Sequence, residues 1–439
     1  MLNQYKFVTQ HTTTQMKEDF LHFVWKNSFF DTKNLMTTQG EPVKILNTGM
    51  ANADAGPDFV NAKILIGDIL WAGNVEIHKS SSDWYAHHHE KDPAYDNVVL
   101  HVVYEDNMPV YNRNNSQIPT LVLSKYIPKR LLKDYNKLIK NKAILRCQNH
   151  IKDVDKYTIL QYKYRLFIER LEYKYQIVKN LLLQTDNNWD QVLYETLLKY
   201  FGGVVNKDAF ELLAGFLPYR VFRKYTAEPF QLEALLFGVS GFLKEDKTDE
   251  YYRALKHEFE FLKEKHGLEI MPAQMIKFHR LRPLNFPTIR LAQFAQVCSQ
   301  TEHLFEKLMQ IRKPADAYEI FELEAGAYWD THYNFDKTTK ARKKRLGKNF
   351  IDILLINVIV PLKFAYQKYK GEYNETEIID LIENIKPEKN RIVNIFTKID
   401  LIAKNALDTQ AIIQLNENYC KKNACLQCDI GHYIIKYGM

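Results

Sequence analysis

The stretch that decides the fold of the first part of the chain is Gly56–Asp106, GPDFVNAKILIGDILWAGNVEIHKSSSDWYAHHHEKDPAYDNVVLHVVYED. Gly67–Asp68 and Gly73–Asn74 are turn signals that divide its first half into strands. Asn97–Asp106 is an almost continuous apolar, β-branched run, which is typical of a strand buried on both faces. The stretch therefore predicts a β-sheet that carries carboxylates and several histidines.

The residues on either side of this stretch predict two different kinds of structure. Glu18–Phe30 has apolar residues at helical spacing and is expected to form an opening helix before the sheet. After about residue 126 the pattern changes to amphipathic segments such as Tyr157–Gln184, which contains neither Gly nor Pro. The sequence predicts an α+β protein, with a mixed-sheet domain over 1–125, an all-α domain over 126–415 and a cysteine-rich segment over 416–439 that packs back on the body.

Composition sets limits on the class of protein. The chain has 439 residues, of which 46% are hydrophobic and 26% charged, as in ordinary globular proteins with two or three domains. A net charge of +7 permits a polyanionic partner without requiring one. The apolar run Phe350–Tyr366 contains Asp352 and Lys363, so it predicts a buried helix and no membrane span. Five cysteines and no apolar leader favour a cytoplasmic location.

Asp58, Glu76 and His78 are the first candidates for a functional site. Side chains alternate along a strand, so Glu76 and His78 should share one face and Lys79 the other. Asp58 begins the preceding strand, and a hairpin would bring its carboxylate close to that of Glu76. Adjacent carboxylates repel unless a cation lies between them. The pattern predicts a Mg²⁺ or Mn²⁺ site at Asp58 and Glu76, as a phosphodiester hydrolase needs.

Pro57–Asp58 followed by Glu76–His78 resembles the motif of the PD-(D/E)xK nucleases, and the predicted order of helix, strand, hairpin and further strand resembles their core. The resemblance implies a metal-dependent nuclease with Asp58 and Glu76 as metal ligands. The family's catalytic lysine is replaced here by His78, which makes Lys63 the candidate for a migrated replacement. Lys79 is a candidate contact for nucleic acid.

The chain also resembles a bacterial family of uncharacterised proteins over nearly its full length. The stretches that carry this resemblance include GPDF, GNVEIH, RPLNFPTIRLAQFA and the C-terminal cysteine cluster. The resemblance implies no known activity.

Histidines that surround the Glu76 strand offer a different kind of metal site. His87–His89 form a run in HHHEKD, and His101 lies in the next predicted strand. Because neutral imidazoles suit transition metals better than Mg²⁺, His78, His89 and His101 could join Glu76 around Zn²⁺, Mn²⁺ or Fe²⁺. The alternative is that the run is a solvated turn and that His101 is a hydrogen-bonded core residue.

A second metal-ligand pattern lies near the end of the sequence. Cys420, Cys425 and Cys428 have C-x4-C-x2-C spacing, which suits an iron–sulfur cluster or Zn²⁺. A closed site needs a fourth ligand. Cys147 is the first choice, and the others are His150 and His432. The alternative is three reduced thiols in a terminal segment.

Clusters of basic residues are candidates for contacts with phosphate. Two segments, KFHRLRPLNFPTIR and KTTKARKKRLGK, contain them: Arg280, Arg282, Arg290, Arg342, Lys343, Lys344 and Arg345. Arginine pairs with phosphate through several N–H donors. We favour the other interpretation, in which the first segment is a brace with arginines paired to carboxylates and the second is a solvated surface.

Three functions remain open on sequence alone. The first is a metal-dependent phosphodiester hydrolase that acts on nucleic acid. The second is a catalytically inactive nuclease-like protein that binds nucleic acid or serves as a scaffold. The third is a transition-metal hydrolase of another substrate. A lysine at Glu76 would favour the first function, a lysine-free site the second, and a histidine-rich metal shell the third.

Overall fold

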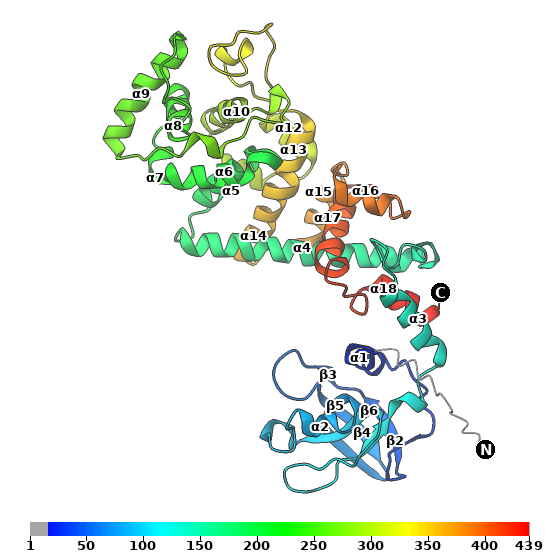
Figure 1. Cartoon of the computed structure of the whole chain (residues 1–439). Coiled ribbons are helices and arrows are strands. Elements are labelled where there is room, and N and C mark those ends of the chain that lie inside the picture. Colours follow the sequence, from blue (N-terminus) through cyan, green and yellow to red (C-terminus); the bar gives the residue numbers. More distant parts are fainter. Residues whose placement is uncertain (1–15, 439) are drawn as a thin grey trace, which may run out of the picture. The chain divides into compact units, whose positions relative to one another are not determined.

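A computed structural model of the chain describes residues 16–438 (Figure 1). Its contacts divide the chain into two compact units, and each is described by itself. Unit 1 extends to Tyr162 and also includes Ile399–Leu401 and the segment from Leu415 onward, whereas unit 2 comprises Lys163–Lys398 and Ile402–Gln414. The boundary predicted near residue 125 therefore lies inside unit 1, and the cysteine-rich C-terminal segment belongs to unit 1.

Unit 1 contains a mixed β-sheet, as the sequence predicts. Its strands have the order β1-β2-β4-β5-β6-β7, and β3 pairs with β4. The strands β2, β4 and β5 are antiparallel, whereas β6 runs parallel to both β5 and β7. The elements are α1 (Glu18–Lys26), β1 (Leu35–Met36), β2 (Pro42–Asn47), β3 (Met50–Ala51), β4 (Phe59–Ile66), β5 (Ile69–Ser80), α2 (Asp83–Ala86), β6 (Val98–Glu105), β7 (Thr120–Val122), α3 (Lys129–Lys140) and α18 (Asp429–Tyr437).

The sheet closes nearly into a barrel. Thr37, next to β1, forms an antiparallel bridge with Leu121 of β7, and the Thr38 N–H donates to the Thr120 carbonyl at 2.8 Å. Such closure pairs the two outer strands, which would otherwise expose unpaired backbone groups. The sheet thus encloses its own core.

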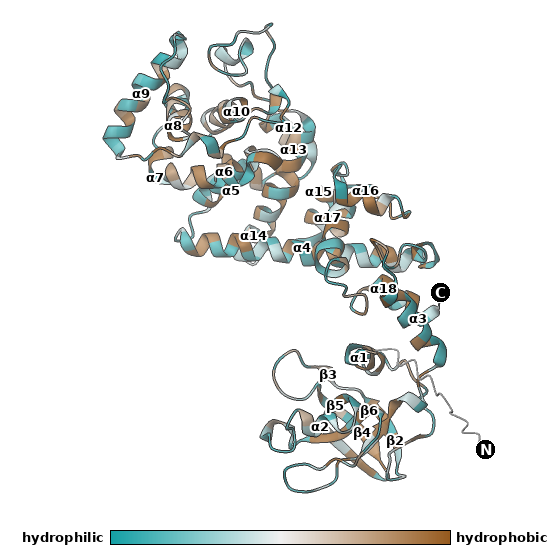
Figure 2. Ribbon diagram, in the orientation of Figure 1, coloured by the Kyte–Doolittle hydropathy of each residue, from teal (hydrophilic) through white to brown (hydrophobic). Residues whose placement is uncertain are grey.

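The central strands follow the sequence pattern closely. Every residue of β6 from Val98 to Val103 is buried, which confirms the prediction of a strand covered on both faces, and these strands are largely hydrophobic in Figure 2. The helix α1 packs against β5 through a buried side that includes Phe20 and Val24. It ends at Lys26, four residues before the predicted end, because Ser28 has a φ of +52° and turns the chain.

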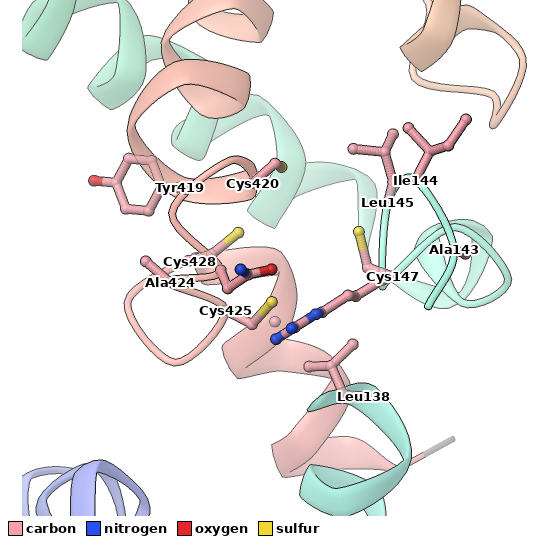
Figure 3. Close-up of a pocket in the computed structure, with 13 residues that line it drawn as sticks. Leu138, Ala143, Ile144, Leu145, Cys147, Tyr419, Cys420, Ala424, Cys425 and Cys428 are labelled. Atoms are coloured by element: carbon pink, nitrogen blue, oxygen red, sulfur yellow. The ribbon is translucent and has the colours of Figure 1, made fainter. Parts of the chain in front are cut away.

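The C-terminal helix α18 lies beside α3 within unit 1. The Arg130 guanidinium of α3 donates to the backbone oxygens of Tyr437 and Lys436, both at 2.6 Å. The segments that precede α18 and follow α3 meet at a pocket that contains Cys147 and Cys425 (Figure 3). The chain therefore returns to unit 1 after it has formed unit 2.

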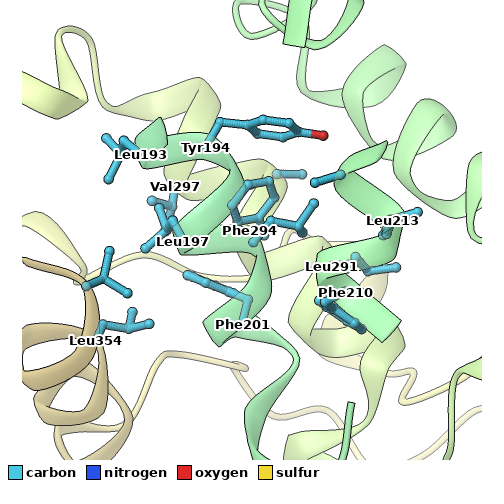
Figure 4. Packing of buried hydrophobic residues seen from close by; sticks show 14 of the residues in the cluster. Leu193, Tyr194, Leu197, Phe201, Phe210, Leu213, Leu291, Phe294, Val297 and Leu354 are labelled. Carbon is cyan, nitrogen blue, oxygen red and sulfur yellow. The ribbon is translucent and has the colours of Figure 1, made fainter. Parts of the chain in front are cut away.

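Unit 2 is helical, as predicted. Its core includes side chains of α5, α6 and α10, among them Leu197, Phe210 and Phe294 (Figure 4). The long helix α4 begins in unit 1 and continues into unit 2. The helices are α4 (Lys156–Gln184), α5 (Trp189–Phe201), α6 (Gly203–Phe216), α7 (Tyr219–Phe222), α8 (Pro229–Val239), α9 (Glu250–His266), α10 (Pro287–Gln300), α11 (Leu304–Met309), α12 (Pro314–Ile320), α13 (Lys348–Leu354), α14 (Val360–Lys370), α15 (Glu375–Glu383), α16 (Arg391–Thr397) and α17 (Ala406–Leu415).

One helical stretch of the described residues, Lys348–Lys370, is long and apolar enough to cross a membrane, but 78% of its most apolar window is buried inside the protein. The core helix of a globular protein has the same properties. Lys363 in this stretch is buried, donates to the carbonyls of Met309 and Ile311, and pairs with Glu377 at 2.8 Å. These internal partners fit the core helix that the sequence predicts.

Candidate metal centre

The candidate centre is built on two parallel neighbours, β5 and β6. Glu76 and His78 lie two residues apart on β5 and therefore share a face, and His101 on β6 stands opposite Glu76 in the register. All three are buried, with exposed fractions of 4%, 1% and 0%. A buried carboxylate and two buried imidazoles are costly unless each finds a partner.

The turn after α2 brings two further histidines to this face. Trp84 of α2 is fully buried, and its ring lies 5.3 Å from that of His89. Tyr95 stacks on His89 with ring centroids 3.8 Å apart, so both aromatic residues serve as packing. His88 has a φ of +62° and is exposed, which reverses the chain between His87 and His89.

Four ligand-capable atoms meet at this point. Glu76 Oε1 lies 3.5 Å from His78 Nε2 and 3.2 Å from His89 Nε2. His78 Nε2 lies 3.1 Å from His87 Nδ1, and one nitrogen of each of these three histidines lies within 4.8 Å of the others. Ligand nitrogens around a tetrahedral Zn²⁺ are about 3.3 Å apart, given Zn–N bonds near 2.05 Å. The three separations of 3.1 to 3.5 Å match such edges, whereas the group in which every ligand atom lies within 4.8 Å of the others contains the three histidines without Glu76.

His101 orients His78. The Nδ1 atom of His78 lies 2.8 Å from His101 Nε2, at hydrogen-bond distance. A proton on Nδ1 of His78 leaves its Nε2 free to bind metal, and such a contact behind a ligand histidine is the usual support in metal sites. His101 therefore stands behind the cluster of His78, His87 and His89, a position that corresponds to the hydrogen-bonded core residue that the sequence left open as the alternative to a ligand.

Burial controls the charges at this site. It lowers the pKa of His78 to about 4, with smaller contributions from His89 and His87, and it lowers the pKa of His101 well below its usual value. Burial raises the pKa of Glu76, although the contact with His89 opposes this shift. Neutral imidazoles are the form that binds metal, and a bound cation would offset the cost of a charged Glu76.

Asp58 lies beside this cluster but faces α1. Its Oδ2 accepts from the Ile77 N–H at 2.9 Å and lies 3.3 Å from His22 Nε2, while its own N–H donates to Glu76 Oε2 at 3.1 Å. Burial lowers the pKa of His22, but the contact with Asp58 and the nearby carboxylates outweigh this, so its pKa is raised. Burial, opposed by His22 and reinforced by Asp58, raises the pKa of Glu18. Asp58 and Glu76 are adjacent, as predicted.

Sequence reasoning missed two of these residues, Glu18 and His22. It expected one histidine of the run His87–His89 at the site, whereas the structure brings both His87 and His89 to it. The only signal for Glu18 and His22 is their spacing of four residues, which places them on one side of a helix. Their proximity to Asp58 follows from the packing of α1 on β5, a contact between elements that are distant in sequence.

The predicted lysines lie on the surface. Lys63 is exposed on β4 between the buried residues Ala62 and Ile64, and Lys79 is exposed directly after His78. Strand alternation accounts for both positions. Among residues 16–438, no lysine forms an ion pair with Asp58 or Glu76, whose ion-pair partners are histidines.

The basic segments of unit 2 are largely engaged within the protein. Arg290 is buried, donates to Gln293 Oε1 at 2.9 Å, and places its guanidinium 3.6 Å above the ring of Phe350. Lys344 is buried and donates to the Asp330 carbonyl at 2.6 Å. Both side chains stabilise unit 2 and are closed to a phosphate ligand.

The other basic candidates are more accessible. Lys343 pairs with Glu324 and Asp330, both at 2.8 Å, and Arg345 pairs with Glu324 at 2.9 Å. Both side chains are exposed, in line with a solvated surface, and they also pair with carboxylates, which the sequence interpretation of this segment did not include. The three remaining candidates are exposed: Arg280, Arg282 and Arg342.

The four cysteines of the second predicted site come together in unit 1. Cys147, Cys420, Cys425 and Cys428 line one pocket of about 50 Å³ (Figure 3). The two alternative ligands have other contacts: His150 lies 3.6 Å from Asp153, and the ring of His432 packs on Phe23 and Phe29. Of the three predicted fourth ligands, Cys147 is the one in the pocket.

Comparison with known proteins identifies a family but no activity. A family model described as "Protein of unknown function (DUF2851)" matches residues 18–391. No curated protein and no solved structure matches the chain, and the PD-(D/E)xK core receives no support from these comparisons. The match covers most of the chain, as the resemblance to an uncharacterised bacterial family predicted. The chain belongs to this family of proteins of unknown function (DUF2851).

Proposed function

We propose that the protein is a metal-dependent hydrolase whose metal ion is held by Glu76, His78, His87 and His89. The supporting observation is the gathering of the nitrogens of His78, His87 and His89 within 4.8 Å of one another, with Glu76 Oε1 3.5 Å from His78 Nε2 and 3.2 Å from His89 Nε2. Three imidazoles and one carboxylate favour Zn²⁺, Mn²⁺ or Fe²⁺ over Mg²⁺. This ligand set replaces the Mg²⁺ or Mn²⁺ site predicted at Asp58 and Glu76 alone.

A metal ion bound here would supply a water of lowered pKa and a Lewis acid for the substrate. The side chains near Asp58 provide the acid–base groups. His22 Nε2 can hold a proton beside Asp58, whose carboxylate accepts the Ile77 N–H and is thereby fixed in place. The side chains of His22 and Asp58 are both partly exposed, although the Nε2 atom of His22 is itself buried.

Phosphodiesters in nucleic acid are the substrate class that we favour. The order α1, β2, β4, β5, α2, β6, with β6 parallel to β5, is the order of elements that the nuclease resemblance implies. Asp58 directly precedes β4 and Glu76 lies on the neighbouring strand β5, as in that motif. The net charge of +7 suits a polyanion. In place of the family's lysine, the proposal assigns proton transfer to His22.

The surface positions of Lys63 and Lys79 favour a second candidate function. Without a lysine near Glu76, the fold could serve as a non-catalytic nucleic-acid-binding or scaffold protein, in which the metal ion stabilises the sheet. The third function, a hydrolase of another substrate, would use the same four metal ligands as the nuclease. It would differ from the nuclease only in the substrate that binds at the metal ion.

Metal analysis combined with activity assays on the full chain tests the proposal. Wild-type protein should contain close to one transition-metal ion per chain at this site. It should hydrolyse single- or double-stranded DNA or RNA, or bis(p-nitrophenyl) phosphate. His89→Ala should lose both metal and activity by about 100-fold or more. His88→Ala, the same substitution at the exposed neighbour, is the control and should retain both.

Three other results would each contradict a different part of the proposal. Metal bound in wild-type protein without turnover of any substrate would overturn the hydrolase and favour the scaffold. Turnover of p-nitrophenyl acetate alone would show that the substrate is a carboxylic ester and not a phosphodiester. Metal content that is unchanged in both His89→Ala and Glu76→Gln would reject the site itself.

A further inference from the structure

The four cysteines of unit 1 are brought together from two distant parts of the sequence. Cys147 follows α3, whereas Cys420 ends a π-helical turn, Asn416–Cys420, and Cys428 is the residue that caps α18. The chain forms all of unit 2 between Cys147 and Cys420. All four thiols are free, with no disulfide among them. Their convergence therefore results from the fold and not from sequence proximity.

The pocket around these thiols is largely apolar, and its backbone segments pack closely against each other. Figure 3 shows the four sulfurs directed toward a common space, with Leu138 and Leu145 nearby. Gly431 of α18 makes the approach possible, since a Cβ at this position would lie 2.1 Å from the Cys425 carbonyl oxygen. Four cysteines that face one space exceed what packing alone requires, because a buried cysteine otherwise behaves as a small apolar residue.

Polar groups around the pocket are arranged to stabilise sulfur anions. Burial raises the pKa of Cys428, and the backbone of Gly431 and Ile430 opposes this shift. Arg146 lines the same pocket and opposes the rise that burial causes in the pKa of Cys425. Donors near sulfur support metal-bound thiolates and adjust the properties of a metal centre.

Burial makes these thiols unsuited to exist as free thiolates. It raises the pKa of Cys147 to about 12, with further contributions from Cys428 and Cys425, and it also raises the pKa values of Cys420, Cys425 and Cys428.

The separation of the sulfurs distinguishes between the two kinds of centre. Sulfurs around a single Zn²⁺ are about 3.8 Å apart, given Zn–S bonds near 2.3 Å. Among residues 16–438, the one group of three ligand atoms within 4.8 Å of one another is formed by His78, His87 and His89. No three of the cysteine sulfurs are that close. A four-iron cluster binds one thiolate at each iron and therefore needs wider spacing.

We propose that Cys147, Cys420, Cys425 and Cys428 bind a 4Fe–4S cluster, which holds the returning C-terminal segment on unit 1. Each thiol loses its proton as its sulfur binds one iron of the cluster. The centre is independent of the metal ion proposed at Glu76, and its sulfide content distinguishes the two. A ligand that joins such distant segments adds its binding free energy to folding.

Anaerobic isolation of the full chain tests the cluster directly. Wild-type protein should contain about four iron and four acid-labile sulfide per chain, with broad absorbance near ~400 nm that bleaches on reduction. Cys425→Ser should lose at least half of the sulfide and of this absorbance. Cys298→Ser, the same change at the fifth cysteine in α10 of unit 2, should retain both.

Two wild-type results would overturn the proposal, even if the variants fail to fold. One is a single zinc per chain with no sulfide, and the other is no sulfide after incubation with ferrous iron and sulfide under anaerobic conditions. A folded Cys425→Ser protein with unchanged sulfide would also overturn it. To separate the two sites, His89→Ala should keep its full sulfide content.

Discussion

His89 Nε2 lies 3.2 Å from Glu76 Oε1, yet this nitrogen has no hydrogen-bond partner of acceptable geometry in a buried site. The distance is that of an ion pair, but the direction of the ring nitrogen does not fit a hydrogen bond. Direction is decisive for a hydrogen bond, which weakens steeply when it is bent. A buried donor or acceptor left in this state costs about 1 to 3 kcal/mol. A metal ion between the two side chains would remove that cost.

His101 should control metal affinity without binding the metal. His101→Leu removes the partner of His78 Nδ1 and leaves the four proposed ligands in place. The loss of such a supporting contact typically weakens metal binding by about 10- to 100-fold. Competitive titration with a zinc chelator measures this change. An affinity equal to that of wild-type protein would show that His101 only fills space.

Asp58 and His22 should affect turnover and not metal binding. Asp58→Asn and His22→Gln each break the contact between these side chains but leave Glu76, His78, His87 and His89 intact. Loss of a positioned acid–base group lowers kcat by about 100-fold or more. Metal content should stay at the wild-type level in both variants. Loss of metal in Asp58→Asn would instead make Asp58 a ligand, as the sequence motif implied.

Much of the fold follows from local patterns in the sequence. The alternation of NVEIHK placed Glu76 and His78 on one face, and the apolar run that contains His101 indicated the buried strand β6. These patterns depend on the two-residue period of a strand, which holds regardless of tertiary contacts. The helical unit and the long helix α4 were predictable from the other local period, the 3.6-residue spacing of apolar residues in amphipathic helices.

The rest depends on contacts between distant residues. The near closure of the sheet relies on a bridge between Thr37 and Leu121, two residues in segments too short to carry a strand pattern. The contact between His22 and Asp58 requires α1 to pack on β5. The burial of Arg290 against the ring of Phe350 could not be predicted either, because the sequence does not indicate which side chain a basic residue will contact.

Gly238 tests the packing of unit 2. It lies on α8, and a Cβ added there would meet the ring of Phe259 at 2.1 Å. Gly238→Ala should therefore lower the free energy of unfolding by about 1 to 3 kcal/mol, because overpacking forces neighbouring side chains out of place. Gly215→Ala is the matched control on α6, where an added Cβ meets nothing within 4 Å. Thermal unfolding should show a lower Tm for the first variant alone.

Glu233 should make stability depend on pH. This α8 side chain is buried, accepts hydrogen bonds from the Trp329 indole at 3.0 Å and the Tyr251 hydroxyl at 2.9 Å, and has no cationic partner among the described residues. Burial raises its pKa from 4.5 to about 7, against the opposing effect of these hydrogen bonds. The folded protein therefore retains a proton that the unfolded chain releases above pH 4.5. The stability that this bound proton contributes to the folded protein is fully present below pH 4.5 and declines as the pH rises to about 7.

The expected loss across this window is about 3 kcal/mol, at 1.36 kcal/mol for each pKa unit. Glu233→Gln has no proton to lose, so its free energy of unfolding, measured by urea denaturation, should lack this component. The difference between wild type and variant should change by about that amount between pH 4.5 and 7. Glu260→Gln, at an exposed position on α9, is the control and should run parallel to wild type. Parallel curves for Glu233→Gln as well would mean that Glu233 is ionised in the folded protein.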